Sequence, residues 1–353
     1  MLVTPPVYPS ARCAHYGEAM RELPDDDAAQ LREYYRHFAA VEAAEVSPLY
    51  AEWAASAAAG DEVLRLLAEV PASKRQPNLL FAAARIHGVE LRSWSHARQQ
   101  VIQRWEAIAA TLRARRTQTN EPGRLAVLNL VLSRIAEEVG RPLALIEVGA
   151  SAGLCLYPDA WPLRYQPGDQ LLSPRGPLHS GVELNCTLEG VEPPSSLPEV
   201  AWRAGVDLNP LDLTRPDDAD WLRALVWPGM EHRLERLDAG AQLVAQQPPH
   251  LVVGDLNEQL AGLLAQVPAG AVPVVFHSAV LVYLPREERA RFLAQLRASG
   301  ARWVSNEGPT VFPGIQQRLP QDEVERQGFV LALDGEPLAR TGPHGQSARA
   351  LPR

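Results

Sequence analysis

The chain has 353 residues, more than one hydrophobic core usually organises, so we expect two structural units. Hydrophobic residues make up 46% and charged residues 22% of the chain, and the net charge of -8 without a long basic run argues against a nucleic-acid partner. No stretch reaches about 18 consecutive apolar residues, so we expect no membrane span and no membrane partner.

Residues 1–119 are predicted to form an α-helical N-terminal region. The segment DDDAAQLREYYRHFAAV repeats apolar residues at helical spacing, and one longer helix is expected over 95–116. The segment TNEPGRLAVLNLVLSRIAEEVG predicts a further helix, with Asn120 as its cap and Gly140 as its end.

After residue 142 the pattern changes to alternating strands and helices. Strands are predicted at 143–148, 200–208, 250–256, 272–278 and 302–308. Helices are predicted at 217–226, 230–246, 257–266 and 286–299. This alternation indicates a parallel α/β sheet. Turns at Asp334-Gly335 and His344-Gly345 predict antiparallel strands at the sheet edge, and residues 157–199 are predicted to be an insertion or an excursion of short strands.

The three cysteines, Cys13, Cys155 and Cys186, form no CxxC pair and no spacing typical of zinc sites. We therefore expect no metal site and a reducing compartment. The opening segment MLVTPPVYPS lacks the charged and apolar regions of a signal peptide, so the cytoplasm is the expected location.

The stretch LALIEVGASAGLCL (143–156) has two interpretations. The first is the nucleophile elbow Gly-x-Ser-x-Gly of serine hydrolases, with Ser151 as the nucleophile. Partners in the required order are available, through Asp255 or Asp334 and then His277 or His344. The hydrolase fold, however, places several strands and an oxyanion-hole loop before the elbow, whereas the preceding residues here are predicted to be helical.

The second interpretation, which we favour, is the first loop of a nucleotide-binding Rossmann unit. Gly149 allows a tight turn after a buried strand, and the small residues Ala150 and Ser151 let ligand and backbone approach closely. Gly153 is predicted to begin a helix whose free N–H groups face a polar ligand. Glu147 lies at the carboxyl end of the strand, where a hydrolase elbow needs no acid. The dinucleotide fingerprint GxGxxG is incomplete, which disfavours NAD.

EVGASAG resembles the first motif of class I S-adenosylmethionine-dependent methyltransferases. GVDLNP (205–210), VVGDL (252–256) and VVFHSAVLVYLP (274–285) are similar to the motifs of their second, third and fourth strands, in the same order. The resemblance covers residues 120–353. It implies a Rossmann-like, doubly wound and mostly parallel sheet, S-adenosylmethionine as cofactor and a small-molecule acceptor.

The resemblance also implies roles for individual residues. Asp207 would hold the ribose hydroxyls, Asp255 and Leu256 would border the adenine, and His277 would be a catalytic base. The cofactor loop would comprise Glu147, Gly149, Ala150, Ser151 and Gly153. The substrate pocket would include Ser278, Tyr283, Arg124 and Asn306.

Several of these residues also fit simpler roles. Asp207 could form a turn, Asp255 could cap a helix, and His277 could be a core histidine. Methyltransferases usually carry the second-strand acid sooner after the glycine loop. Either residues 157–199 are inserted or the acid is Glu183, and we favour Asp207 because GVDLNP leads into a predicted helix.

The whole chain is also similar to an uncharacterised bacterial family, a domain of unknown function with a helical N-terminal part and a methyltransferase-like core. The segments TNEPGR, RAGVDLNPLD and DGEPLARTGPHG carry this resemblance. In that arrangement the helical region would form a lid or an acceptor pocket. The sequence does not indicate an oligomeric state, and a Rossmann-like protein that binds a nucleotide or a partner without catalysis is the main alternative.

Overall fold

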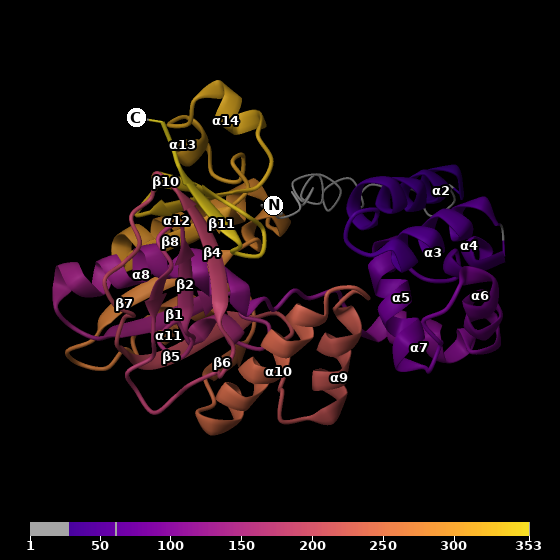
Figure 1. Ribbon diagram of the computed structural model, residues 1–353, viewed down its shortest axis with the longest axis horizontal. Helices are drawn as coiled ribbons and strands as arrows, with labels where there is room; N and C mark the ends of the chain where they lie inside the picture. The colour runs from indigo at the N-terminus through magenta and orange to yellow at the C-terminus, as the bar shows by residue number, and fades with distance from the viewer. Residues whose placement is uncertain (1–27, 61, 353) are drawn as a thin grey trace. The chain divides into compact units, whose positions relative to one another are not determined.

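The computed structural model describes residues 28–60 and 62–352, which form two compact units (Figure 1). Unit 1 contains the described residues up to Thr119 together with Pro216–Leu234, and unit 2 contains Asn120–Arg215 and the described residues from Glu235 onward. The sequence did not indicate that Pro216–Leu234 belong with the N-terminal helices. Cys13 lies outside the described residues.

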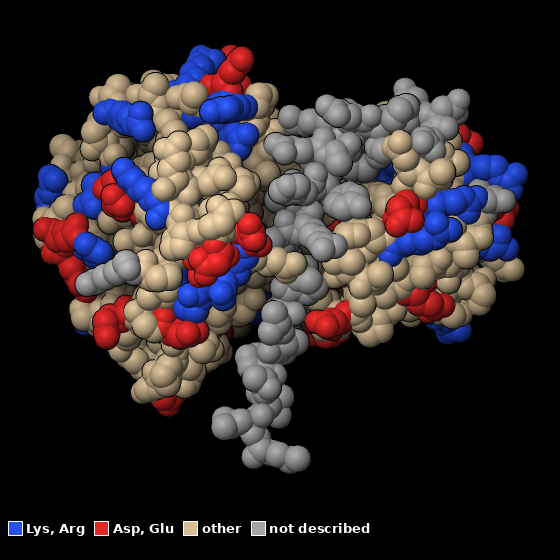
Figure 2. Space-filling model, turned by 90° about the horizontal axis from the view of Figure 1, so that it is seen from above, with Lys and Arg blue, Asp and Glu red and all other residues tan. Residues whose placement is uncertain are grey.

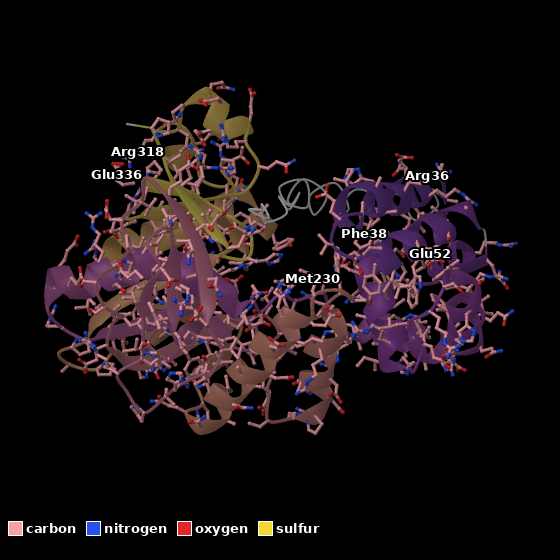
Figure 3. All side chains as sticks on the ribbon, viewed as in Figure 1. Arg36, Phe38, Glu52, Met230, Arg318 and Glu336 are labelled. Carbon is pink, nitrogen blue, oxygen red and sulfur yellow. The ribbon has the colours of Figure 1, made fainter. Side chains whose placement is uncertain are left out.

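Unit 1 is helical. Its elements are α2 (Ala28–His37), the π-helix η1 (Phe38–Ala43), α3 (Pro48–Ala59), α4 (Glu62–Leu67), η2 (Ala72–Lys74), α5 (Pro77–Ile86), α6 (Trp94–Gln103), α7 (Trp105–Ala114) and α9 (Pro216–Leu225). The prediction of a single helix over 95–116 is therefore wrong, because the helix is interrupted at Arg104, between α6 and α7. The core is aromatic, with the Phe81 ring centre 4.9–6.4 Å from those of five other aromatic side chains, and Phe38 lies among these helices (Figure 3).

Unit 2 is built on one mixed sheet. Its strands are β1 (Leu143–Val148), β2 (Leu163–Gln166), β3 (Gln170–Leu172), β4 (Leu184–Glu189), β5 (Val200–Asp207), β6 (His250–Val253), β7 (Val272–Ser278), β8 (Arg302–Glu307), β9 (Phe329–Leu333), β10 (Glu336–Thr341) and β11 (Ser347–Ala350). Their order is β3-β2-β4-β11-β10-β9-β8-β7-β1-β5-β6. The five predicted strands are confirmed as β1, β5, β6, β7 and β8, and neighbours among them pair in parallel. The predicted α/β class with a mostly parallel sheet is thus confirmed.

Helices and 3-10 turns connect and cover these strands. They are η3 (Pro122–Arg124), α8 (Leu125–Val139), η4 (Leu154–Leu156), α10 (Glu231–Gln246), α11 (Leu256–Leu264), η5 (Leu281–Tyr283), α12 (Arg286–Ser299), α13 (Pro313–Gln316) and α14 (Gln321–Glu325). The helix predicted to begin at Gly153 is wrong, because only the three-residue turn η4 follows. Pro158 and Pro162 come next, and proline lacks the N–H group that would continue a helix.

The C-terminal strands lie inside the sheet and not at its edge. The predicted Asp334-Gly335 turn joins the antiparallel strands β9 and β10, and β11 follows the turn at His344-Gly345. Arg318 pairs with Glu336 at 3.0 Å beside this hairpin (Figure 3). However, β11 also pairs in parallel with β4, so the strands of 157–199 continue the sheet beyond the C-terminal strands. The expected edge position is therefore wrong.

The two faces of the sheet are covered by different helices. On one face, Ile146 of β1 and Val275 of β7 pack in a core with Leu260 of α11 and Phe292 of α12. Helix α8 contacts β4, β8 and β9, and its N-terminal end lies near Glu147, which strand alternation places on the opposite face. The two faces therefore offer two different environments at the carboxyl ends of the strands.

Candidate functional site

The residues predicted from the sequence gather at the carboxyl ends of β1, β5, β7 and β8, but they divide between the two faces of the sheet. Strand alternation places one group on the face of α8 and the other on the face of α11 and α12. The first group comprises Glu147, Asp207, Ser278 and Asn306. The second comprises His277 and Glu307. The strands therefore do not bring His277 and Glu147 to the same face.

The glycine loop 149–153 is held by bonds within the protein. The Gly149 N–H donates to the carbonyl of Val206 at 2.8 Å, and the Leu154 N–H donates to Oδ1 of Asn120 at 3.1 Å. Nδ2 of Asn120 in turn donates to the carbonyl of Ala150. Asn120 thus fastens this loop, whereas we had predicted it to cap the following helix, and these amide groups are not free to hold an anion.

Neighbouring side chains also fill the space that the small residues of the loop leave. An ideal Cβ on Gly149 would lie 2.3 Å from Cγ2 of Val280, and one on Gly205 would lie 2.5 Å from the Cβ of Ala150. Gly149 has the positive φ expected of a tight turn, at +72°, and Ser151 has a φ of +49° with a buried side chain. The predicted tight turn is confirmed. The side chain that comes close to the backbone of Gly149 is that of Val280.

Asp207 is the acid next to the glycine loop. Its strand β5 pairs with β1, and its Oδ2 accepts from the Ser151 N–H at 2.8 Å while Oδ1 accepts from the Asn209 N–H at 2.8 Å. Glu183 instead forms a bidentate ion pair with Arg164 beside β4, which is not a neighbour of β1. Of the two acids, Asp207 is therefore the one beside the glycine loop, and it also forms the turn that was its simpler role.

Glu147 is a buried carboxyl with unused hydrogen-bonding capacity. Its side chain is 6% exposed, and Oε2 has no hydrogen-bond partner among the described residues. Burial raises the pKa of the Glu147 carboxyl well above its ordinary value, the charge of Arg124 opposes that shift, and the charge of Asp207 adds to it. A buried oxygen without a partner is costly, so it suggests a ligand or a functional role.

Arg124 and Ser278 lie beside this carboxyl. The guanidinium of Arg124 donates from Nη1 to the carbonyl of Ser278 at 2.9 Å and from Nε to the carbonyl of Pro343 at 3.0 Å. Arg124 therefore joins the end of β7 to the turn after β10.

Ser278 belongs to a chain of side-chain hydrogen bonds. Thr341 Oγ1 donates to Oδ1 of Asn306 at 2.6 Å, and Nδ2 of Asn306 donates to Oγ of Ser278 at 2.9 Å. The shorter distance is typical of O–H···O and the longer of N–H···O, which fixes the orientation of the amide. Since Ser278 Oγ accepts from Asn306, its own proton can point to a ligand at the strand ends.

His277 is fully buried and bonded at both ring nitrogens. Its Nε2 accepts from the indole N–H of Trp303 at 2.9 Å, and its Nδ1 lies 2.8 Å from Oε1 of Glu307. Indole only donates, so Nδ1 carries the proton and the ring is held as one neutral tautomer. A base role for His277 would require it to break the bond with Trp303.

The other predicted contacts have local structural roles or are exposed. Asp255 caps α11, because its Oδ1 accepts from the Asn257 N–H at 2.7 Å, and Leu256 packs in the core of unit 2. Tyr283, predicted to line the substrate pocket, is 55% exposed on η5. Sequence reasoning missed the roles of Trp303 and Thr341, which no local motif marks.

Neither a metal site nor a membrane span is evident in the parts that the structure covers. Among the described residues, no group of three or more His, Cys, Asp or Glu side chains is placed to hold a metal ion. No helix in the described ranges is both long and apolar enough to cross a bilayer. On the face drawn in Figure 2, Lys and Arg are interspersed with Asp and Glu.

Comparison with known families identifies the chain. The profile of the uncharacterised proteins conserved in bacteria that are grouped as DUF2332 matches residues 32–349. The chain belongs to this family. The predicted membership of an uncharacterised bacterial family is thus confirmed, and the match extends over helices and sheet alike. No curated protein matches the chain.

Replacing Glu147 of this DUF2332 protein by glutamine is expected to stabilise it at neutral pH and to leave its stability unchanged in acid. The buried carboxyl keeps its proton to a higher pH than in the unfolded chain. Above the ordinary Glu pKa of about 4.3 the unfolded state therefore ionises first, which favours unfolding. Relative to Glu147→Gln, the wild type should lose up to about 1.4 kcal/mol per pH unit until the raised pKa is reached.

Urea denaturation of the wild type and the Glu147→Gln variant across this pH range measures the effect. Stability curves that stay parallel from acid to neutral pH would show that the carboxyl is not perturbed. A gain at neutral pH would identify Glu147 as a residue that is kept at a cost in stability, as expected of a functional site.

Proposed function

We propose that unit 2 binds S-adenosylmethionine at the carboxyl ends of β1, β5 and β7 and transfers its methyl group to a small acceptor. The order β6-β5-β1-β7-β8 supports a Rossmann-like, doubly wound arrangement, because the chain builds outward from β1 first to one side and then to the other. Ligands of such sheets bind where the strand order reverses, and this point lies at β1.

The observation that carries the proposal is the buried, unpartnered Oε2 of Glu147 beside Asp207. S-adenosylmethionine supplies an electrophilic methyl on a cationic sulfonium and carries an ammonium and a carboxylate. In the proposed complex Glu147 accepts a hydrogen bond from the ammonium of the cofactor, and Ser278 Oγ donates a hydrogen bond to an oxygen of the methyl acceptor. A buried carboxylate is stabilised when a cation pairs with it, so binding would relieve the desolvation of Glu147.

Exposed apolar side chains nearby fit the rest of such a ligand. Leu208, which follows β5, is 64% exposed, and Val253, the last residue of β6, is 67% exposed. Large apolar side chains at neighbouring strand ends offer a surface for a flat heteroaromatic ring. Asp207 lies between this apolar rim and Glu147, where it could also accept from ribose hydroxyls, because each carboxylate oxygen has more than one lone pair.

The proposed chemistry depends on alignment more than on covalent catalysis. Residues on the face of α8 would orient the methyl donor and exclude water. No observation tests catalysis by His277. In the proposed complex His277 lies on the face of α11 and α12 and positions Glu307 and Trp303.

Two observations weigh against the serine-hydrolase alternative. A nucleophile elbow is followed by a helix, but Ser151 is followed by the short turn η4. His277 contacts Glu307 and Trp303 through its two nitrogens, which leaves neither for Ser151. N–H groups of the glycine loop already donate to groups of the protein, which is consistent with the alternative of a non-catalytic binding protein.

Calorimetric titration of S-adenosylmethionine tests the proposal. We expect heat of binding with the wild type and at least about a tenfold loss of affinity with Asp207→Asn. Glu183→Gln, which changes the alternative acid beside β4, is the matched control and should bind as the wild type does. Absence of heat with folded wild-type protein would overturn the proposal.

Two further outcomes separate the alternatives. Labelling of Ser151 by a fluorophosphonate probe would support the hydrolase, and loss of the label in Ser151→Ala would locate it. Binding of S-adenosylmethionine without turnover on a panel of hydroxyl and amine acceptors would support a binding protein. The methyltransferase proposal instead predicts that Ser151→Ala keeps most of the affinity, because the loop is fastened through backbone groups.

A further inference from the structure

The segment 279–284 covers the glycine loop. Val280 packs directly on the backbone of Gly149, so closely that an added Cβ there would lie 2.3 Å from Cγ2 and 2.9 Å from Cβ of Val280. In Rossmann-type loops the first glycine makes the tight turn, and the residues after it let a ligand approach the backbone. Val280 therefore covers the turn at the start of the loop that would hold the proposed cofactor.

One carboxylate oxygen holds the segment in this position. Oε1 of Glu307 accepts from the Val280 N–H at 3.0 Å, from the Leu281 N–H at 3.1 Å and from Nδ1 of His277. Oε2 of the same side chain is buried and has no partner among the described residues. Glu307 on the neighbouring strand β8 thus holds the segment through two consecutive backbone amides.

The backbone at the start of the segment is strained. Ala279 has a φ of +56°, a backbone conformation that residues other than glycine rarely adopt. Such strain persists only where the surroundings impose it, and here the Ala279 N–H donates to the carbonyl of Asn306. Beyond Leu281, Tyr283 is 55% exposed, whereas Val282 and Leu284 pack against the core of unit 2.

We propose that residues 279–284 form a gate over the glycine loop, closed in this structure, with Glu307 as its latch. Opening moves Val280 away from Gly149 and releases the strain at Ala279. The ligand assigned to this gate rests on the proposed function, but the opening itself does not.

Hydrogen exchange measured by mass spectrometry tests the opening without any ligand. We expect the amides of 279–284 to exchange faster than those of β7, and Val280→Ala to accelerate exchange in both 279–284 and 147–153. Val282→Ala removes the same two methyl groups from the same segment, and it should leave 147–153 as in the wild type. Protection of 279–284 equal to that of β7, or no change in 147–153 with Val280→Ala, would overturn the gate.

Titration with S-adenosylmethionine tests the link to ligand binding. If a closed gate limits the binding-competent fraction, Val280→Ala should raise the apparent affinity by about tenfold, while Val282→Ala should not change it. Wild-type binding with no gain in Val280→Ala overturns the gate and leaves the proposed function standing. Coupled exchange without binding in either protein supports the gate and overturns the proposed function.

Discussion

Gly345→Ala is expected to lower the free energy of unfolding of unit 2 by about 3–5 kcal/mol. The turn after β10 lies against η3 so closely that a Cβ on Gly345 would be 2.0 Å from the carbonyl oxygen of Gly123 and 2.8 Å from the Cα of Arg124. Both are backbone atoms, which cannot turn aside as a flexible side chain can. Gly345 also has a φ of +79°, so alanine would be strained there even without the contact.

Gly300→Ala is the matched control for this variant. Gly300 has a φ of +69° at the end of α12, but nothing lies within 4 Å of a Cβ at that position. It should therefore cost only about 1 kcal/mol, the conformational part of the effect. Urea denaturation of both variants gives the comparison. Equal losses would mean that the turn moves away from η3 freely, and the contact would then not define the position of Arg124.

This contact also shows what the sequence could and could not predict. TNEPGR and GPHG were recognisable as segments that the chain shares with an uncharacterised family. Their meeting across more than two hundred positions depends on the register of β10 and β11, which no local pattern encodes. The strands β1, β5, β6, β7 and β8 were predicted because short apolar runs between turn signals are local features.

Strand alternation in the sequence already implies that the candidate site divides between two faces of the sheet. His277 and Ser278 are adjacent in a strand, so alternation alone places them on opposite faces. The helix after Gly153 was predicted by analogy with Rossmann loops, although the prolines that follow argue against it locally. The turn and helix after GVDLNP are local signals, and the structure places Asp207, not Glu183, beside the glycine loop.

Contacts between side chains were the least predictable part of the site. Trp303 and Glu307 lie on β8 and reach a histidine on β7, and such pairs follow from the strand order and not from spacing along the chain. The same holds for Thr341 and Asn306. Their hydrogen bonds became apparent only once β8, β9 and β10 were known to be neighbours.

Glu307→Ala is expected to cost about 3–5 kcal/mol of the free energy of unfolding, because it removes one acceptor from three donors at once. Nδ1–H of His277 and the N–H groups of Val280 and Leu281 would lose their common partner, Oε1 of Glu307. His277 and Leu281 are fully buried, so their groups cannot find water in exchange.

Two milder variants separate the acceptor from the volume of the side chain. Glu307→Gln keeps the shape and one carbonyl oxygen, so it should retain most of the bonds and lose about 1–2 kcal/mol. Trp303→Phe removes only the indole donor to Nε2 of His277 and should cost a similar amount beyond the change in packing. Denaturation curves for the three variants should therefore rank Glu307→Ala as the least stable.

An alanine variant within about 1 kcal/mol of the wild type, with hydrogen exchange in 279–284 also unchanged, would contradict the latch role, because three buried donors would then have been satisfied without Glu307. If Glu307→Ala lost protection from hydrogen exchange only in 279–284 and kept its global stability, Glu307 would hold this segment and nothing else. A large loss in both would mean that the same carboxylate joins β8, His277 and the segment over Gly149 into one cooperative element. The residues around the proposed cofactor site would then be stabilised by a hydrogen-bond network on the opposite face of the sheet.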